Sequence, residues 1–341
     1  MKRVVDLAMV CLCVFLVFSF AGVYASDDVI VIKAVGDTML GSLTPKTIIP
    51  PRAGEEFVET IGPYLKGADI VMCNLEGVFI KEGFKPAKCG GKRWYCFEFG
   101  MPVYLTNAFK KMGFNVVSFN NNHVMDYGRM GYEFTIRVLK ELGMKCADME
   151  NYDVIEVKGR KVCIVAFGFS GGKYSVIDVE KAKEIVRELK EKYDVVIVSF
   201  HGGAEGPSAL NTKNKTEYFL GRNRGNVIAF ARGVVSAGAD LVIGHSPHVL
   251  RAVEVYKGKL IAYSLGNFLT YGNFNIKGYG GIGGILEVHL GKGNTLVKVN
   301  FIPTVQLPPG IPVYDKEKRA IKLINRLGKE DFPDSYYSFS E

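Results

Sequence analysis

The chain is poor in histidine and tryptophan, and it has no dense block of positive charge. Five histidines and one tryptophan occur among 341 residues. Lysine and arginine outnumber aspartate and glutamate by 43 to 35, but the basic residues are spread along the chain. A nucleic-acid-binding protein has a more concentrated basic footprint, so we expect no nucleic-acid partner. The net charge of +8 indicates a surface that leans cationic, and attraction to anionic partners is the alternative interpretation.

A long hydrophobic run is confined to the N-terminus. Lys2 and Arg3 precede an uncharged run from Leu7 to Ala25 that ends in Val23-Tyr24-Ala25. This pattern predicts a secretory signal cleaved after Ala25. The alternative is an uncleaved anchor, because the run is long enough to span a membrane. In both cases we expect the rest of the chain to be exported, as a periplasmic or extracellular protein or one anchored at the outer face of the cytoplasmic membrane.

Cysteine is sparse as well, with seven copies. Cys11 and Cys13 lie in the N-terminal run, and the odd number that remains cannot all pair within the chain. Cys89 and Cys96 flank a short glycine-containing segment, a spacing that predicts a disulfide in an exported protein. Cys163 lies inside an apolar run, where a buried and inert thiol is expected.

After residue 25, short apolar runs alternate with amphipathic stretches, which is typical of α/β proteins. The apolar runs predict buried strands at 29–35, 69–73, 115–119, 195–200 and 240–243. The amphipathic stretches predict helices at 56–66, 103–112, 128–142, 179–192 and 227–237. No repeat or low-complexity linker interrupts the pattern. We therefore expect one domain over 26–341, with a motif core at 29–303 and a closing helix at 315–328 capped by Asp315.

Ligand-type side chains follow each of the five predicted buried strands. They are Asp37, Glu76, Asn122, His123, His201, His245 and His248. Ligands of α/β sheets bind at the carboxyl ends of the strands, so these residues are expected to meet at one rim. A single Asp or Asn after a strand usually caps a helix, and a single His is usually structural. Four of the five histidines nevertheless fall at strand ends, which favours metal binding or catalysis, whereas His289 is interpreted as structural.

Six short motifs stand in order along the chain. They are Gly36-Asp37-Thr38-Met39, Asn74-Leu75-Glu76-Gly77, Asn121-Asn122-His123 with Asp126, His201 with Glu205, Gly244-His245-Ser246-Pro247-His248 and Tyr263-Ser264-Leu265-Gly266-Asn267-Phe268. With these motifs the chain resembles the capsule-synthesis CapA family, which includes the PgsA-type proteins of poly-γ-glutamate production. That family is similar to the calcineurin-like metallophosphoesterases. The resemblance implies an α/β fold with a two-sheet β-sandwich core flanked by helices, in four layers α/β/β/α.

The resemblance also implies a role for each residue at a dinuclear metal site. Asp37 and His248 would bind the first metal, His201 and His245 the second, with Glu76 bridging and Asn122 as the amide ligand. His123 would assist the leaving group. Apart from the resemblance, Asp126 and Glu205 are candidates to orient His123 and His201, and the alternative for both is a surface or capping carboxylate. The chain departs from the metallophosphoesterase pattern at Met39, where a histidine is usual, because a thioether is a poor ligand for hard divalent ions. It departs from many relatives at Gly202-Gly203, where Trp-Gly is common.

Two functions are therefore expected as alternatives. The first is an exported enzyme in which two divalent ions (Mn, Zn, Fe or Mg) activate water against a phosphoester or an amide, in an anionic polymer or its phosphorylated precursor. The second is a non-catalytic, metal-binding subunit that works with membrane-bound polymer synthase or export subunits. The complete set of histidines favours the first, and Met39 favours the second.

Overall fold

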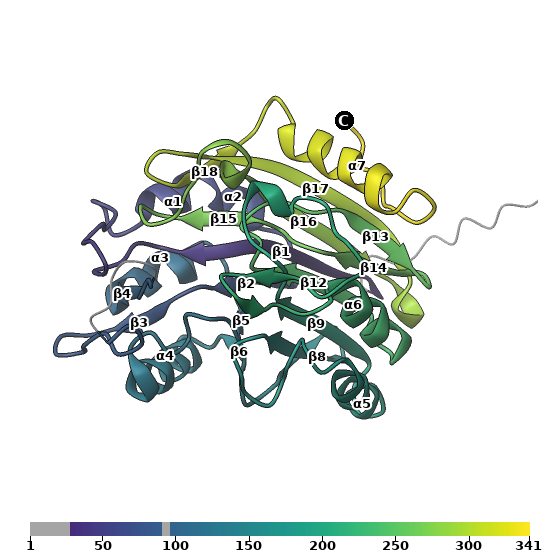
Figure 1. The fold of residues 1–341 in the computed structure, drawn as a ribbon, viewed down its shortest axis with the longest axis horizontal. Helices are drawn as coiled ribbons and strands as arrows, with labels where there is room; N and C mark the ends of the chain where they lie inside the picture. Colours follow the sequence, from purple (N-terminus) through teal and green to yellow (C-terminus); the bar gives the residue numbers. More distant parts are fainter. Residues whose placement is uncertain (1–27, 91–95) are drawn as a thin grey trace, which may run out of the picture.

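The computed structural model describes residues 28–90 and 96–341, and most of its strands belong to two sheets (Figure 1). The eight-stranded sheet contains β1 (Ile30–Met39), β2 (Ile70–Leu75), β5 (Val116–Phe119), β6 (Lys145–Asp148), β15 (Asn267–Thr270), β16 (Ile282–Leu290), β17 (Leu296–Leu307) and β18 (Ile311–Tyr314). The six-stranded sheet contains β7 (Asp153–Val157), β8 (Arg160–Gly168), β9 (Val195–His201), β12 (Leu241–His245), β13 (Val253–Tyr256) and β14 (Lys259–Ala262). Two small ribbons pair β3 (Val78–Ile80) with β4 (Gly100–Pro102) and β10 (Tyr218–Phe219) with β11 (Arg222–Asn223).

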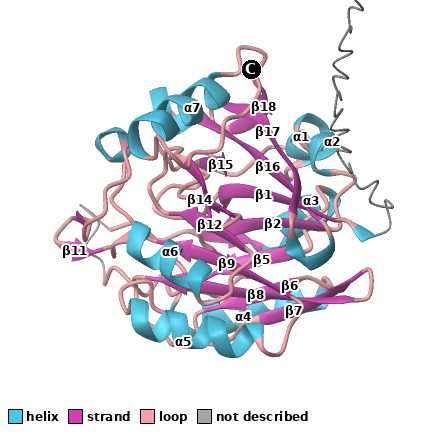
Figure 2. Ribbon diagram, turned by 90° about the vertical axis from the view of Figure 1, so that its right-hand side faces the viewer, coloured by secondary structure: helices cyan, strands magenta, loops and turns pink. Residues whose placement is uncertain are grey.

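Helices cover the outer faces of the two sheets (Figure 2). The helices beside the eight-stranded sheet are α1 (Glu55–Thr60), α2 (Gly62–Leu65), α3 (Thr106–Lys111) and α4 (Gly128–Glu141). Those beside the six-stranded sheet are α5 (Val179–Lys190) and α6 (Val227–Ser236), while α7 (Arg319–Asp331) lies across β13, β16 and β17. The expected four-layer α/β/β/α arrangement is confirmed.

The central strands are apolar because they are buried on both faces. Ile32 and Ala34 of β1 belong to the core between the sheets, together with Val165 and Ile197 of the second sheet. Val35, also in β1, packs in a second core under helices α1 to α4. Parallel strands covered on both faces lose the usual alternation of polar and apolar residues. This is why the buried strands stand out in the sequence as uninterrupted apolar runs.

The elements differ from the predicted boundaries where backbone chemistry intervenes. The helix expected at 56–66 divides into α1 and α2 because Pro63, in the first turn of α2, has no backbone N–H to continue the helix. The closing helix begins at Arg319 rather than at 315, and Lys318 is its N-cap. Asp315 accepts hydrogen bonds from the backbone N–H groups of Glu317 and Arg319, so its side chain orders the turn before the helix.

The described part of the chain contains one disulfide and three free cysteines. Cys89 and Cys96 form a disulfide, as their spacing predicts, and Cys73, Cys146 and Cys163 are free and buried. The segment expected to be a signal or an anchor, 1–25, lies outside the described residues. Within residues 28–90 and 96–341, no helix combines the length and the apolar character needed to cross a bilayer.

Candidate metal centre

The carboxyl ends of strands from both sheets deliver the candidate residues. In the first sheet, Asp37 on β1 lies between Asn74 on β2 and Asn267 on β15. In the second sheet, His201 on β9 lies directly beside His245 on β12. The site therefore lies where the ends of two sheets meet, and not along the rim of one sheet as the strand pattern alone suggested.

Two glycines allow the backbone to pass close to neighbouring strands just before a candidate ligand. A Cβ at Gly36 would lie 1.9 Å from the carbonyl oxygen of Gly266. A Cβ at Gly244 would lie 2.3 Å from the carbonyl oxygen of Tyr263 and 2.5 Å from the ring of Phe200. The strand ends that carry Asp37 and His245 are thus packed too tightly for a side chain at the preceding position.

Substitution of Gly244 should therefore be costly. Gly244→Ala is expected to lower the free energy of unfolding by about 1–3 kcal/mol, because backbone and ring must move apart to admit the methyl group. Gly62→Ala is the matched control, since its Cβ would be 3.7 Å from the nearest side-chain atom, in a helix. Urea unfolding of both variants measures the difference. Equal stability of the two variants would contradict the argument.

Asp37, Glu76 and His248 form the tightest group at the site, with ligand atoms that all lie within 4.8 Å of one another. His248 Nδ1 is 3.0 Å from Asp37 Oδ2, and its Nε2 is 3.7 Å from Glu76 Oε1. Ser246 and His248 both have a positive φ, 98° and 57°. A non-glycine backbone in this region is strained, and such strain is concentrated at functional sites.

Three further histidines lie around the same two carboxylates. His201 Nε2 is 3.9 Å from Glu76 Oε1 and 2.8 Å from the amide oxygen of Asn122. His123 Nε2 is also 3.9 Å from Glu76 Oε1. His245 Nδ1 is 3.7 Å from Asp37 Oδ1. All seven strand-end residues predicted from the sequence therefore lie in one cluster, with the carboxylates of Asp37 and Glu76 at its centre.

The centre of the cluster contains polar atoms that have no partner among the described residues. Both carboxylate oxygens of Glu76 and both ring nitrogens of His245 are buried and accept or donate no hydrogen bond. Leaving such groups unsatisfied costs about 1–3 kcal/mol each, more for a charge. Carboxylate, imidazole and amide oxygen are the donors that divalent transition metals take. The residues present therefore fit a metal centre.

Electrostatics distinguish the four central groups. Burial would raise the pKa of Asp37, but the hydrogen bond with His248 and the charges of His248 and His245 lower it to about 2. Burial and the charge of Asp37 raise the pKa of Glu76 well above its usual value. Burial lowers the pKa of His248, yet Glu76 and Asp37 outweigh burial and raise it to about 10. Burial lowers the pKa of His245 to about 4, so His245 is neutral, which is the form that binds metals.

His123 is oriented by a carboxylate and an ammonium group. Its Nδ1 lies 2.7 Å from Asp126 Oδ2, and Lys88 donates a hydrogen bond to the other oxygen of Asp126. Asp126 is fully buried and also accepts the backbone N–H of Phe99. These contacts fix the ring so that Nε2 faces Glu76. Asp126 thus occupies the orienting position that the sequence predicts for it.

Glu205 has different neighbours from those expected. Arg224 donates a 2.7 Å hydrogen bond to Glu205, and Glu205 Oε2 is 3.9 Å from His248 Nε2. Among the described residues Glu205 forms no hydrogen bond or ion pair with His201, because the ion pair with the buried Arg224 holds it on the His248 side. The assignment of Glu205 to His201 is therefore corrected.

Met39 points away from the cluster. Its side chain is fully buried in the apolar core under the helices, and its sulfur accepts the backbone N–H of Gly41. Met39 thus supplies no ligand atom to the group around Asp37. His289 likewise lies apart from the site, where its ring pairs with Glu287.

Residues 31–271 match the model of the family described as bacterial capsule synthesis protein PGA_cap. The chain belongs to this family. The matched span includes every residue of the cluster.

Three relatives of this chain have names that refer to capsule or polyglutamate-type polymer synthesis or biosynthesis. The capsule biosynthesis protein CapA of Bacillus anthracis is 28% identical over 271 residues, 72% of this chain and 61% of the relative. The PGA biosynthesis protein CapA of Bacillus subtilis is 28% identical over 269 residues, 72% of this chain and 64% of the relative. A probable polyglutamine synthesis accessory protein of Mycobacterium tuberculosis is 27% identical over 244 residues, 63% and 57% of the two chains. The chain thus spans less than two thirds of the length of these relatives.

Among solved structures, the NAD nucleotidase (NadN) of Haemophilus influenzae is similar with a TM-score of 0.41 and 12% sequence identity, covering 89% of this chain and 56% of that one.

Sequence reasoning about this PGA_cap chain missed several site residues. Asn74 donates a 2.8 Å hydrogen bond to Asp37, and Asn267 Oδ1 lies 3.1 Å from His248 Nδ1. Both lie inside the sequence motifs, and Asn74 directly follows the strand predicted at 69–73, which was an available signal, whereas Asn267 is the first residue of β15. Lys88 and Arg224 lie in segments without periodicity, and no sequence signal indicated them.

Proposed function

We propose that this chain is an exported capsule or poly-γ-glutamate biosynthesis protein with a dinuclear metal site, which hydrolyses a phosphoester or an amide in an anionic polymer or its phosphorylated precursor. Family membership and the names of the relatives support the biosynthetic context. The observation that carries the metal site is the set of unpartnered buried atoms on Glu76 and His245. The N-terminal sequence pattern supports export.

Each candidate ligand has a defined place in this proposal. Asp37, Glu76 and His248 would hold one ion, and Glu76 would share the other with Asn122, His201 and His245. When bound, divalent ions (Mn, Zn, Fe or Mg) polarise a substrate oxygen and activate water at neutral pH. His123 would exchange a proton at Nε2 with the departing oxygen or amine, because Asp126 holds its Nδ1 side.

Metal content and turnover test this proposal together. The protein, purified under mild chelation, is expected to retain metal, and His245→Ala should weaken metal affinity more than about 100-fold, since even partners of ligands contribute 10- to 100-fold. His289→Ala is the matched control, a histidine on β16 outside the cluster. Phosphoester and amide substrates are assayed in added manganese or zinc. A protein without metal, indifferent to His245→Ala, would refute the proposal.

A second candidate function is a non-catalytic, metal-binding subunit of an envelope-polymer synthesis or export complex. The observation that favours it is Met39, which is buried in the apolar core and leaves the group around Asp37 without the usual histidine. Its partners would be membrane-bound synthase or export subunits. Bound metal combined with no turnover on any phosphoester or amide, and with loss of polymer output in His245→Ala cells, would select this candidate over the enzyme.

A further inference from the structure

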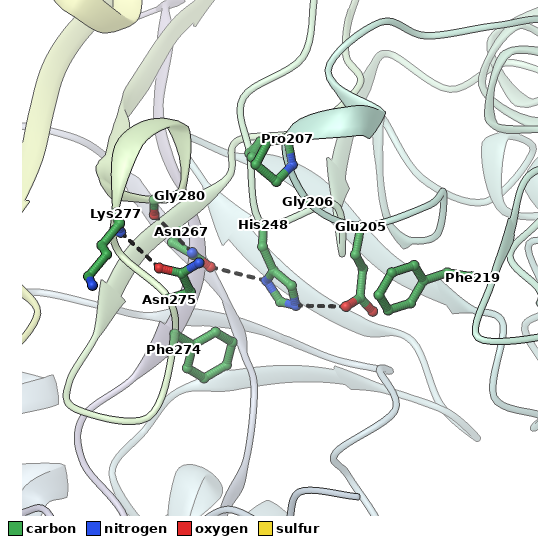
Figure 3. A pocket seen from close by; sticks show the side chains of 11 residues that line it. Glu205, Gly206, Pro207, Phe219, His248, Asn267, Phe274, Asn275, Lys277 and Gly280 are labelled. Atoms are coloured by element: carbon green, nitrogen blue, oxygen red, sulfur yellow. Dashed lines mark hydrogen bonds and ion pairs between the residues drawn. The ribbon is translucent and has the colours of Figure 1, made fainter. Parts of the chain in front are cut away.

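Two adjoining pockets flank His248 and form one cleft over the candidate metal centre. Their volumes are about 600 Å³ and about 380 Å³. They share five lining residues, which are Glu205, Phe219, His248, Phe274 and Asn275. The smaller pocket is drawn in Figure 3, where His248 lies between Asn267 and Glu205. The cleft therefore continues past the cluster on both sides.

The two arms of the cleft end in different residues. Lys277 lines only the smaller pocket, and Arg222 lines only the larger one. In Figure 3, Lys277 and Phe219 lie on opposite sides of His248. Arg222 is the cross-strand partner of Phe219 in the β10–β11 ribbon, so it belongs to the side away from Lys277. Lys277 is thus the cation of the smaller pocket, while Arg222 lines the larger one together with Lys88 and Arg224.

The other two cations of the larger pocket, Lys88 and Arg224, are neutralised by ion pairs, whereas Arg222 and Lys277 are not. Lys88 pairs with Asp126, and Arg224 pairs with Glu205. Arg222 and Lys277 are exposed, and neither has an ion pair with any residue that the structure describes. Two unpaired cations on either side of a site provide charge complementarity for a ligand that carries anionic groups at intervals.

The walls between these cations are largely apolar. Phe219 and Phe274 line both pockets, and Pro207 and Val249 line the smaller one. A chain whose charges are separated by methylene groups can place those groups against aromatic and aliphatic walls. A polyphosphate offers no such apolar segment. The lining therefore favours an aliphatic chain that carries carboxylates.

We propose that the cleft binds an internal segment of a linear polycarboxylate of the glutamate-polymer class, with one carboxylate at Arg222, another at Lys277 and the backbone crossing His248. This inference rests on the proposed function for its biological setting, but the two can fail separately. It assigns the site an endo mode of binding, in which the polymer enters one arm and leaves through the other.

Binding of γ-linked glutamate chains to the full-length protein tests this assignment. A long polymer is expected to bind more tightly than a glutamate dimer, because only the long chain reaches both arms. Arg222→Ala and Lys277→Ala should each weaken polymer binding about two- to fivefold, and the double variant by the product of the two. Lys322→Ala, an exposed lysine on α7 outside the cleft, is the charge-matched control and should change nothing.

Several results would overturn the inference. They are equal affinity for dimer and polymer, a full-affinity Arg222→Ala or Lys277→Ala variant, and tighter binding of polyphosphate than of a polycarboxylate of equal charge. The metal content of both variants is measured alongside. A protein without metal that still binds the polymer through both arms would refute the proposed function but keep this inference. A protein that holds metal and turns over substrate, but whose polymer binding does not depend on Arg222 and Lys277, would refute this inference and keep the proposed function.

Discussion

Arg251→Leu is expected to lower the free energy of unfolding by about 3–5 kcal/mol, because it removes one partner of a buried ion pair. The Arg251 side chain is completely buried, and its two terminal nitrogens donate to Glu217 at 2.9 and 2.7 Å. It also donates to the carbonyl oxygen of Ala209 at 2.7 Å. The substitution leaves the Glu217 carboxylate buried without its partner. Urea unfolding measures the loss.

Two further variants distinguish the effect of breaking this buried ion pair from the effect of breaking an exposed one. Arg251→Leu combined with Glu217→Met should recover most of the stability, because no unpaired charge remains in the interior. Arg326→Ala breaks an exposed pair with Glu330 on α7 and should cost less than about 1 kcal/mol. If Arg251→Leu were as mild as Arg326→Ala, the buried pair would have no structural role.

The Arg251–Glu217 pair also bears on the site. The Glu217 carboxylate accepts the backbone N–H of Ala204, while its own backbone N–H donates to the carbonyl of Gly225 and its carbonyl accepts the N–H of Arg224. This segment carries Glu205 and Arg224, which stand beside His248. Arg251, which is buried beneath this segment, therefore positions one wall of the cleft through Glu217.

The parts of the fold that could be predicted are those in which one physical requirement governs a whole segment. Strands β1, β2 and β9 are buried on both faces, so they appear as apolar runs, and the polar residue that ends each run is conspicuous. Asp37, Glu76 and His201 were found in this way. The meeting of two sheets at the site could not be read from the runs themselves, because strand order depends on contacts between distant segments.

The residues that escaped prediction act through contacts between segments far apart in the sequence. Arg251 and Glu217 are 34 positions apart, and Lys88 and Asp126 are 38 apart. A charged residue in an irregular segment normally faces solvent, so nothing in its neighbourhood signals burial. Edge strand β18 and the short β15 escaped for a related reason, since each has only four residues and little periodicity.

Metal binding should stabilise the fold, and this is the second large effect. Addition of manganese or zinc to about 100 times the dissociation constant is expected to raise the free energy of unfolding by about 2.7 kcal/mol. The rise follows because the folded chain alone brings Asp37, Glu76 and His248 together. Thermal or urea unfolding with and without metal measures it. His289→Ala should retain the full rise, since its ring pairs with Glu287 instead.

Glu76→Met distinguishes a metal-binding role of Glu76 from a purely structural one, because its expected effect on the free energy of unfolding has opposite signs with and without metal. In metal-free protein the variant should be more stable than the natural chain by about 1–3 kcal/mol, because it removes two buried oxygens that have no hydrogen-bond partner. In the presence of metal the order should reverse, because the variant has lost a carboxylate of the group formed by Asp37, Glu76 and His248. A Glu76 that serves only the fold would instead make the variant less stable under both conditions. Opposite signs in the two conditions would identify Glu76 as a residue kept at a cost in stability for the ion it binds.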